Sequence, residues 1–228
     1  MHLGLSIPLF NEEDSVTEVV ASVHSILTEA EVPHTLVLVN NGSTDQTRQA
    51  IDSLLVPGII EAVHLRENAG YGGGILTGLA HLEQTGLPEV IGWSWGDGQV
   101  TASVLPSLFD AIANGADIAK AVRTRRNDGP LRQAITTGYA ATMRALGTRT
   151  RDINGCPKLM TRDAFLAIQP TSTDWFLDAE VVLAAERLDL RVDGVPVTMQ
   201  KRVHGKSKVG ARTIAEFGKN ILSWRLGR

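Results

Sequence analysis

The chain of 228 residues has little cysteine and no long apolar run. Its single cysteine, Cys156, excludes an intramolecular disulfide and fits a reducing compartment. No apolar stretch approaches the roughly 20 residues that a membrane-spanning helix needs, and acidic residues from Glu12 onward come too early for a signal peptide. With 43% hydrophobic and 21% charged residues, the composition is that of a globular domain. We therefore expect a cytoplasmic protein.

Acidic and basic residues are unevenly distributed, although the formal net charge is only -3. Residues 120–151 contain eight Lys and Arg against one Asp, and residues 198–228 contain eight against one Glu. Basic segments in an otherwise acidic chain indicate polyanionic ligands or contact with an anionic surface. The alternative is a solvated charged face without a ligand.

Short apolar runs alternate with amphipathic segments through the first half of the chain. This pattern predicts strands at residues 3–9, 35–41, 59–65, 89–94 and 117–123, with helices between them that begin near residues 11, 43, 70 and 101. Repeated strand–helix units indicate a mainly parallel sheet, flanked by helices, in an α/β fold. Ligands of such sheets bind at the carboxyl ends of the strands, so the loops at residues 7–12, 40–45 and 95–99 are expected to meet at one site.

The second half of the chain is less regular. We expect a helix at residues 131–146, a loop at 151–165, a helix at 178–188 and a strand at 191–199. A last helix at residues 212–226 has an apolar stripe and several basic side chains. The predicted organisation is one domain over residues 1–210, followed by a basic amphipathic helix at 211–228.

Two loop-to-helix junctions are rich in small and polar residues. "NNGSTDQT" at residues 40–47 is a good helix start, with Ser, Thr and Asp available for capping. "ENAGYGGGILTGL" at residues 67–79 permits close approach of a ligand to the backbone, but it lacks the spacing of a P-loop or of a dinucleotide fingerprint. Taken singly, each segment favours a structural role over a functional one.

Their order along the chain is more specific. "IPLFNEE", "VNNGSTDQT", "ENAGYGGGILTGL", "WGDGQ", "DINGCPKLMTRDAF", "WFLDAEVV" and "RVHGKSK" occur in register over residues 5–209. This series resembles the family 2 glycosyltransferases, and among them the dolichol-phosphate mannose synthase type. The resemblance implies the nucleotide-diphospho-sugar transferase (GT-A type) fold.

The resemblance also implies where a nucleoside-diphosphate sugar binds. The residues that it assigns to donor binding are Pro8, Phe10, Asn11, Glu12, Asn41, Asp45, Gly70 and Gly74. Phe10 stands where tyrosine is usual, and Asn40 and Asn41 stand where the family commonly has two aspartates, one of which contacts the base. Because an amide both donates and accepts hydrogen bonds, these residues leave the base open.

Asp97 matches the second acid of the family's Asp-x-Asp metal motif, and Trp95 replaces the first. The resemblance assigns Asp97 and Gln99 to a Mg²⁺ or Mn²⁺ ion. One carboxylate, substrate phosphates and water are an ordinary ligand set for Mg²⁺, so we expect metal-assisted chemistry with weak binding of free metal. Trp95 either packs against the donor or belongs to the core.

Basic side chains are expected both near the donor diphosphate and near the acceptor. In "RVHGKSK", Arg202 and Lys208 resemble the family's segment that closes over the donor diphosphate, where positive charge stabilises the departing group. In the first basic segment, the side chains that resemble the family's acceptor-facing loop are Arg123, Arg125, Arg126 and Arg132. Planar guanidinium groups suit phosphate.

Asp178 in "WFLDAEVV" matches an acidic position of the family. If the acceptor is a hydroxyl group, the transfer needs a general base, and Asp178 is the candidate. If the acceptor is a phosphate, no base is needed and Asp178 orients the metal or the acceptor. The third alternative is a helix N-cap.

The sequence thus predicts an inverting glycosyltransferase that moves a sugar from a nucleoside-diphosphate sugar to a polyprenyl phosphate. A lipid acceptor would place the protein peripherally at the inner face of the membrane, through its basic segments. One alternative keeps the donor chemistry but uses a soluble hydroxyl acceptor such as a nucleoside, a sugar or a natural-product intermediate. A second is a non-catalytic nucleotide-sugar binding protein. No nucleic-acid partner is expected.

Overall fold

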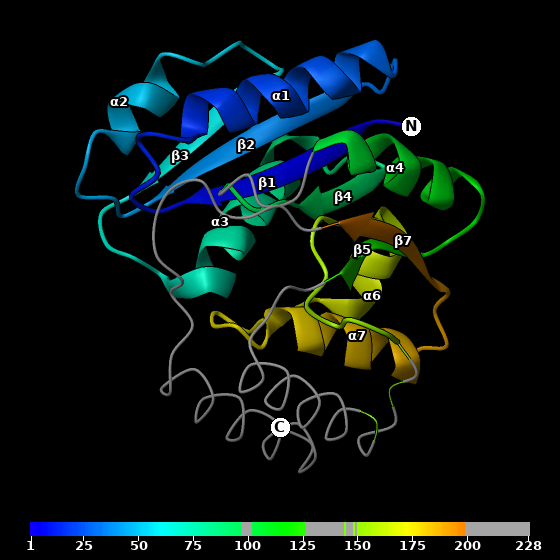
Figure 1. The fold of residues 1–228 in the computed structure, drawn as a ribbon. Helices are drawn as coiled ribbons and strands as arrows, with labels where there is room; N and C mark the ends of the chain where they lie inside the picture. Colours follow the sequence, from blue (N-terminus) through cyan, green and yellow to red (C-terminus); the bar gives the residue numbers. More distant parts are fainter. Residues whose placement is uncertain (97–101, 126–143, 145–147, 149, 199–228) are drawn as a thin grey trace.

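The computed structural model describes residues 1–96, 102–125, 144, 148 and 150–198. Its centre is a seven-stranded sheet in the order β3-β2-β1-β4-β6-β5-β7, in which only β6 runs antiparallel to its neighbours (Figure 1). The strands are β1 (Leu3–Leu9), β2 (His34–Asn41), β3 (Ile60–Leu65), β4 (Val90–Trp93), β5 (Ile118–Arg125), β6 (Lys158–Thr161) and β7 (Val192–Thr198). The predicted mainly parallel sheet is therefore confirmed.

Helices cover both faces of the sheet (Figure 1). On one face lie α1 (Val16–Glu29), α2 (Thr47–Asp52) and α4 (Leu105–Ala113), the last preceded by the 3-10 turn η1 (Ala102–Val104). On the other face lie α3 (Gly70–Gly86), α6 (Arg162–Ile168) and α7 (Leu177–Arg187). Each layer of helices buries its own hydrophobic cluster against the sheet. This burial stabilises the three-layer arrangement.

The two faces of β1 differ in side-chain size. Its leucines and isoleucine are fully buried on the side of α1, whereas Gly4, Ser6 and Pro8 face α3. Small residues there let α3 approach closely: the Ser6 hydroxyl donates to the Ile75 carbonyl at 3.1 Å, and a Cβ on Gly78 would lie only 2.2 Å from Ser6 Oγ. The close approach brings the glycine-rich start of α3 to the carboxyl ends of β1 and β2.

One expectation for the second half is wrong. Residues 151–165 were expected to form a loop, but they contain β6 and the start of α6. β6 has only four residues and inserts antiparallel between β4 and β5, so it is too short to show a period of its own. The expected helix at 178–188 and strand at 191–199 correspond to α7 and β7.

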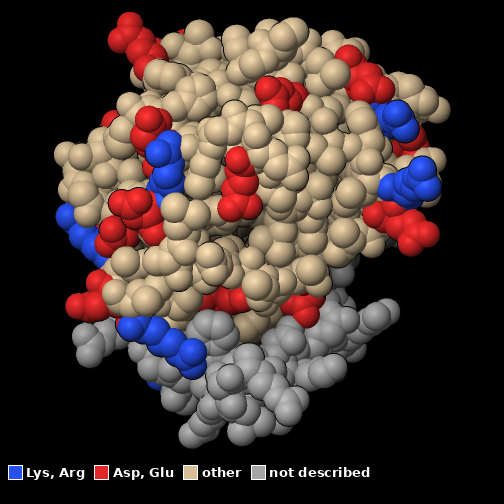
Figure 2. Space-filling model, turned by 180° about the vertical axis from the view of Figure 1, so that it is seen from behind, with Lys and Arg blue, Asp and Glu red and all other residues tan. Residues whose placement is uncertain are grey.

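Several expectations fall outside the described residues. They are most of the helix at 131–146, the helix at 212–226 and the division between residues 210 and 211. Among the described helices, none is both long and apolar enough to cross a membrane. On the face shown in Figure 2, Lys and Arg side chains are interspersed with Asp and Glu. Of the second basic segment, residues 198–228, only Thr198 belongs to the described residues.

Candidate active site

Hydrogen bonds tie the loop after β1 to the loop after β2. The Asn11 backbone amide donates to Ser43 Oγ at 3.1 Å, and the Thr44 amide donates to Asn11 Oδ1 at 2.9 Å. A third link runs from the Gln46 amide to Glu13 Oε2 at 2.7 Å. Asn11 has a φ of 54°, a left-handed conformation that asparagine tolerates better than most residues. The two loops therefore form one rim at the carboxyl ends of the strands.

The Asp45 carboxylate stabilises this rim through hydrogen bonds with Thr47. It accepts from the Thr47 hydroxyl at 2.6 Å and the Thr47 amide at 3.0 Å, and Thr47 Oγ1 accepts from the Glu12 amide at 2.9 Å. Burial alone would raise the pKa of Asp45, but the hydrogen bonds from Thr47 lower it below its ordinary value. The carboxylate is therefore ionised at neutral pH and holds the start of α2.

The two asparagines at the end of β2 are buried, and both side chains make hydrogen bonds within the protein. Asn40 Oδ1 accepts from the Ser43 amide at 3.1 Å. The Asn41 amide group accepts from the Ala69 backbone amide and donates to the Gly70 carbonyl, both at 2.9 Å. Asn41 thus fixes the loop that leads into α3, and its predicted contact with the donor stays a prediction.

The structure brings four of the predicted donor-binding residues together. A Cβ placed on Gly74 would lie 2.8 Å from Asn41 Nδ2 and 3.0 Å from Pro8 Cβ, and Asn41 is bonded to Gly70. The end of β1, the end of β2 and the start of α3 therefore meet within one small region. The loop with Asn11, Glu12 and Asp45 borders the end of β1.

The glycines at the start of α3 accommodate the protein's own backbone. The Gly73 amide donates to the Thr173 carbonyl at 2.9 Å, and a Cβ on Gly72 would lie 2.2 Å from the Ser172 carbonyl oxygen. Glu180, which is buried, holds this neighbouring loop by accepting from the amides of Thr171 and Ser172. Close backbone approach, which the sequence suggested for a ligand, occurs here with residues 171–174.

Replacement of Gly72 by alanine is expected to destabilise the fold by about 1–3 kcal/mol, because the added methyl overlaps a backbone carbonyl that cannot move freely. In an exposed helix the same change would stabilise by about 1 kcal/mol. Urea unfolding of Gly72→Ala, with Ala80→Gly on the exposed side of α3 as a control for helix propensity, measures the difference. A stabilised Gly72→Ala protein would show that the 171–174 loop does not pack as described.

Asp178 lies in a buried ion pair. Its Oδ1 is 2.6 Å from Lys158 Nζ, and its Oδ2 accepts from the Tyr71 hydroxyl at 2.9 Å. Lys158 is fully buried and Asp178 nearly so. Asp178 does not act as an N-cap, because α7 begins at Leu177, its N-cap position is Phe176 and no side chain caps it.

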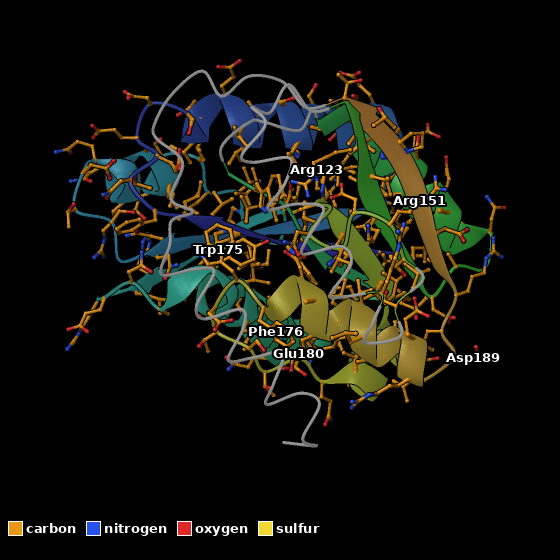
Figure 3. All side chains as sticks on the ribbon, turned by 60° about the horizontal axis from the view of Figure 1, so that its bottom comes forward. Arg123, Arg151, Trp175, Phe176, Glu180 and Asp189 are labelled. Atoms are coloured by element: carbon orange, nitrogen blue, oxygen red, sulfur yellow. The ribbon has the colours of Figure 1, made fainter. Side chains whose placement is uncertain are left out.

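Trp95 is linked to this pair through Tyr71. The Trp95 indole donates from Nε1 to the Tyr71 hydroxyl oxygen at 3.1 Å, and the Tyr71 ring stacks on Trp175 with 4.3 Å between ring centroids. The Arg123 guanidinium carbon lies 5.8 Å from the centroid of the Trp95 ring, within the range of a cation–π contact. Figure 3 shows Arg123 on the side of β5 and Trp175 on the side of α3.

Arg123, one of the predicted acceptor-binding residues, is paired within the protein. Its Nε and backbone amide both donate to Asp152 Oδ2 at 2.8 Å, and a terminal guanidinium nitrogen donates to Oδ1. Its side chain is only 8% exposed, so the pairing limits the donors left for a phosphate. Burial opposes ionisation of Asp152, but its hydrogen bonds with Arg123 lower the pKa of the carboxyl group.

Lys120 and Lys158 come from the adjacent strands β5 and β6, and both are fully buried. Lys120 Nζ donates to the carbonyls of Arg151 and Asp152 at 2.8 and 2.7 Å. Burial, followed by repulsion from Lys158, lowers the pKa of Lys120 to about 7. The sequence interpretation missed both lysines, although a lysine within an apolar strand run ("AKAV", "PKLM") is unusual enough to mark a paired site.

The predicted metal ligands and most of the predicted cations belong to segments outside the structural description. Asp97, Gln99, Arg126, Arg132, Arg202 and Lys208 lie outside the described residues, as does the side chain of Arg125. The residue before Asp97 is placed: the Gly96 carbonyl accepts from Ser15 Oγ at 3.3 Å, and the same hydroxyl is 3.0 Å from Glu12 Oε2. Within the described part of the chain, no group of three or more His, Cys, Asp or Glu could hold a metal ion.

Comparison with known proteins identifies the family. The model of the family described as "Glycosyl transferase family 2" matches residues 5–169. The chain belongs to glycosyl transferase family 2. A curated member of similar sequence is the undecaprenyl-phosphate 4-deoxy-4-formamido-L-arabinose transferase of Pseudomonas fluorescens (strain Pf0-1), 27% identical over 213 residues. That match covers 90% of this chain but 59% of the relative, so the chain spans about three fifths of the length of that protein.

Solved structures of other proteins superpose on this chain. Glucosyl-3-phosphoglycerate synthase from Mycobacterium tuberculosis, in complex with phosphoglyceric acid, matches with a TM-score of 0.75 and 18% identity. The match covers 97% of this chain and 79% of that one. The same synthase in complex with Mn²⁺ and uridine-diphosphate-glucose matches with a TM-score of 0.73 and 18% identity, over 97% and 78% of the two chains. The predicted GT-A type fold is confirmed.

Proposed function

We propose that this protein is an inverting glycosyltransferase that moves a sugar from a nucleoside-diphosphate sugar to a polyprenyl phosphate. Membership of glycosyl transferase family 2 supports the reaction class. The acceptor class is supported by the name of the similar Pseudomonas protein, an undecaprenyl-phosphate transferase. The single structural observation that carries the choice of acceptor is the buried pairing of Asp178 with Lys158 and Tyr71.

The hydrogen bonds and burial of Asp178 bear on the choice between a hydroxyl acceptor and a phosphate acceptor. A general base must reach the proton that it abstracts, within hydrogen-bonding distance or through one water. Both oxygens of Asp178 are already bonded, and its side chain is 3% exposed. A hydroxyl acceptor requires such a base, whereas a phosphate oxygen is already anionic and attacks the anomeric carbon directly. The structure of this pair therefore favours a phosphate acceptor.

The donor site is proposed at the carboxyl ends of β1, β2 and β4. Pro8, Asn41 and Gly74 meet there, and the rim around Asn11 and Asp45 closes one side. The related fold binds Mn²⁺ and uridine-diphosphate-glucose in the Mycobacterium tuberculosis synthase. The described residues supply no complete metal site, so we assign the ion to Asp97, Gln99 and the donor phosphates; when bound, it adds positive charge beside the leaving diphosphate.

A polyprenyl phosphate also gives a role to the basic segments, because its headgroup is an anion at a membrane surface. We propose that the protein contacts the membrane peripherally through residues 198–228, in which eight basic residues stand against one acidic residue.

Transfer assays with matched acceptors test the proposed function. The purified protein is incubated with Mn²⁺ or Mg²⁺, a panel of nucleoside-diphosphate sugars, and either a short-chain polyprenyl phosphate or the corresponding polyprenol. We expect a glycolipid product with the phosphate and none with the alcohol. Product from the polyprenol or from a soluble hydroxyl compound would favour the second acceptor class. Donor binding without transfer to any acceptor would favour a binding protein.

A further inference from the structure

We propose that Asp178 is a positioning residue: held by Lys158, it fixes the Tyr71 hydroxyl, and Tyr71 in turn orients Trp95 as a wall of the donor site. The inference rests on the proposed function for the identity of the donor, and it adds a specificity-determining role for Tyr71 and Trp95.

The hydrogen-bond directions in this chain of contacts are fixed by the chemistry of its members. An ionised carboxylate only accepts and an indole N–H only donates. The Tyr71 hydroxyl therefore donates to Asp178 at 2.9 Å and accepts from Trp95 at 3.1 Å. Burial, and then the charge of Asp178, raise the pKa of Tyr71 well above its ordinary value, so the hydroxyl keeps the proton that it donates. Hydrogen-bond donation therefore converges on Asp178: Lys158 and Tyr71 both donate to its carboxylate, and Trp95 donates to Tyr71.

Besides the hydrogen bonds at their edges, the Tyr71 and Trp95 rings each have a neighbour over one face. Tyr71 stacks on Trp175 with an angle of 8° between the rings, and Arg123, held by Asp152, lies over Trp95. A ring fixed by a hydrogen bond at its edge and by a neighbour at its face has little rotational freedom. Recognition by such a preorganised surface avoids the entropy cost of ordering the side chain on binding.

Trp95 stands beside the proposed donor. It follows the carboxyl end of β4, and the next residue, Gly96, packs so closely that a Cβ there would lie 2.3 Å from Leu9 Cδ2 and 3.2 Å from the Pro8 carbonyl oxygen. Pro8 also borders Gly74 and Asn41. The turn that carries Trp95 therefore adjoins the region where three predicted donor-binding residues meet. The apolar face of the indole suits the apolar face of a sugar ring or the base of the nucleotide.

An ion pair with a purely structural role would not need the further hydrogen bonds from Asp178 through Tyr71 to Trp95. A buried Lys–Asp pair satisfies its own charges, and apolar residues of the same volume often stabilise a core equally well. Tyr71 is the one side chain within the run of glycines at 70–74, a segment otherwise adapted to close backbone packing. Its hydroxyl joins two elements, the start of α7 and the end of β4, that are otherwise separate in this contact chain.

A double-mutant cycle tests the inference. Donor affinity is measured by calorimetry with Mn²⁺ and a nucleoside-diphosphate sugar that the wild-type protein binds, for Tyr71→Phe, Trp95→Phe and the double variant. We expect Tyr71→Phe to weaken donor binding about three- to tenfold, as for one lost hydrogen bond, with kcat within about twofold. Because Tyr71 acts through Trp95, the double variant should bind the donor no more weakly than Trp95→Phe alone.

Additive effects on donor affinity, or a loss confined to kcat, would overturn the positioning role. Thr77→Val is the control for removal of a hydroxyl from α3: Thr77 Oγ1 donates only to the Gly73 carbonyl among the described bonds, so donor affinity should not change. The same cycle on urea unfolding needs no ligand, and a coupling below about twofold in the unfolding equilibrium constant would contradict the contact chain. If the wild-type protein binds no nucleotide sugar, the proposed function fails, while the unfolding cycle still tests the contacts.

Discussion

Lys158→Met is expected to lower the free energy of unfolding by about 3–5 kcal/mol, the largest effect on stability that the described residues predict. The substitution keeps an unbranched apolar stem, with a thioether sulfur in place of one methylene, and removes the ammonium group. Asp178 would then remain as a buried carboxylate without its ion-pair partner, since the lysine Nζ lies 2.6 Å from Oδ1 and both residues are almost inaccessible. Urea unfolding at pH 7 measures the loss.

Two companion variants separate the cost of an unpaired charge from the loss of a contact. Lys158→Met combined with Asp178→Leu removes both charges, so its stability should return to within about 1–2 kcal/mol of the wild-type value. Arg191→Ala breaks the exposed pair between Arg191 and Asp193, and this change should cost less than about 1 kcal/mol. A single Lys158→Met variant as stable as Arg191→Ala would contradict the description of Asp178 and Lys158 as a buried ion pair.

The first half of the fold could be predicted because its elements are continuous in sequence. A buried strand is predicted by the leucines and isoleucine of β1, and another by the apolar run of β2. The segment between these strands has helical periodicity. β6 could not be predicted in this way. Its four residues pair on both sides with residues that are 38 or more positions away in the sequence, so its existence depends on tertiary pairing.

The candidate site likewise has features that the sequence predicts and features that depend on tertiary contacts. The order of motifs identified the three loops, and the structure links two of them directly through Asn11 and Ser43. The network of Tyr71, Trp95, Lys158 and Asp178 joins residues up to 107 positions apart, and no local spacing reports such a contact. The glycines at 72 and 73 show what a sequence motif leaves open. Their pattern predicted a close approach to the backbone, but it did not distinguish a ligand from residues 171–174 as the partner.

Asp97→Ala is expected to reduce metal-dependent transfer at least about a hundredfold, the largest effect on activity that the chain predicts. A metal ion contributes several kcal/mol to the stabilisation of charge in such reactions, and each 1.4 kcal/mol corresponds to a factor of ten in rate. With Trp95 in place of a first acid, Asp97 is the one carboxylate of the motif, so on the proposed ligand set its removal would leave the ion substrate oxygens, Gln99 and water. Initial rates measured over a titration of Mn²⁺ check the expectation.

The titration distinguishes a metal ligand from a residue that only shapes the loop. If Asp97 holds the ion, Asp97→Asn should require far more Mn²⁺ for half-maximal rate while its unfolding midpoint in urea stays close to that of the wild type. Trp95→Asp restores the paired acids and should lower the Mn²⁺ requirement, even though it removes the indole that donates to Tyr71 and weakens donor binding. The two substitutions thus move metal affinity in opposite directions. An Asp97→Asn protein with an unchanged Mn²⁺ requirement would show that the ion is bound elsewhere.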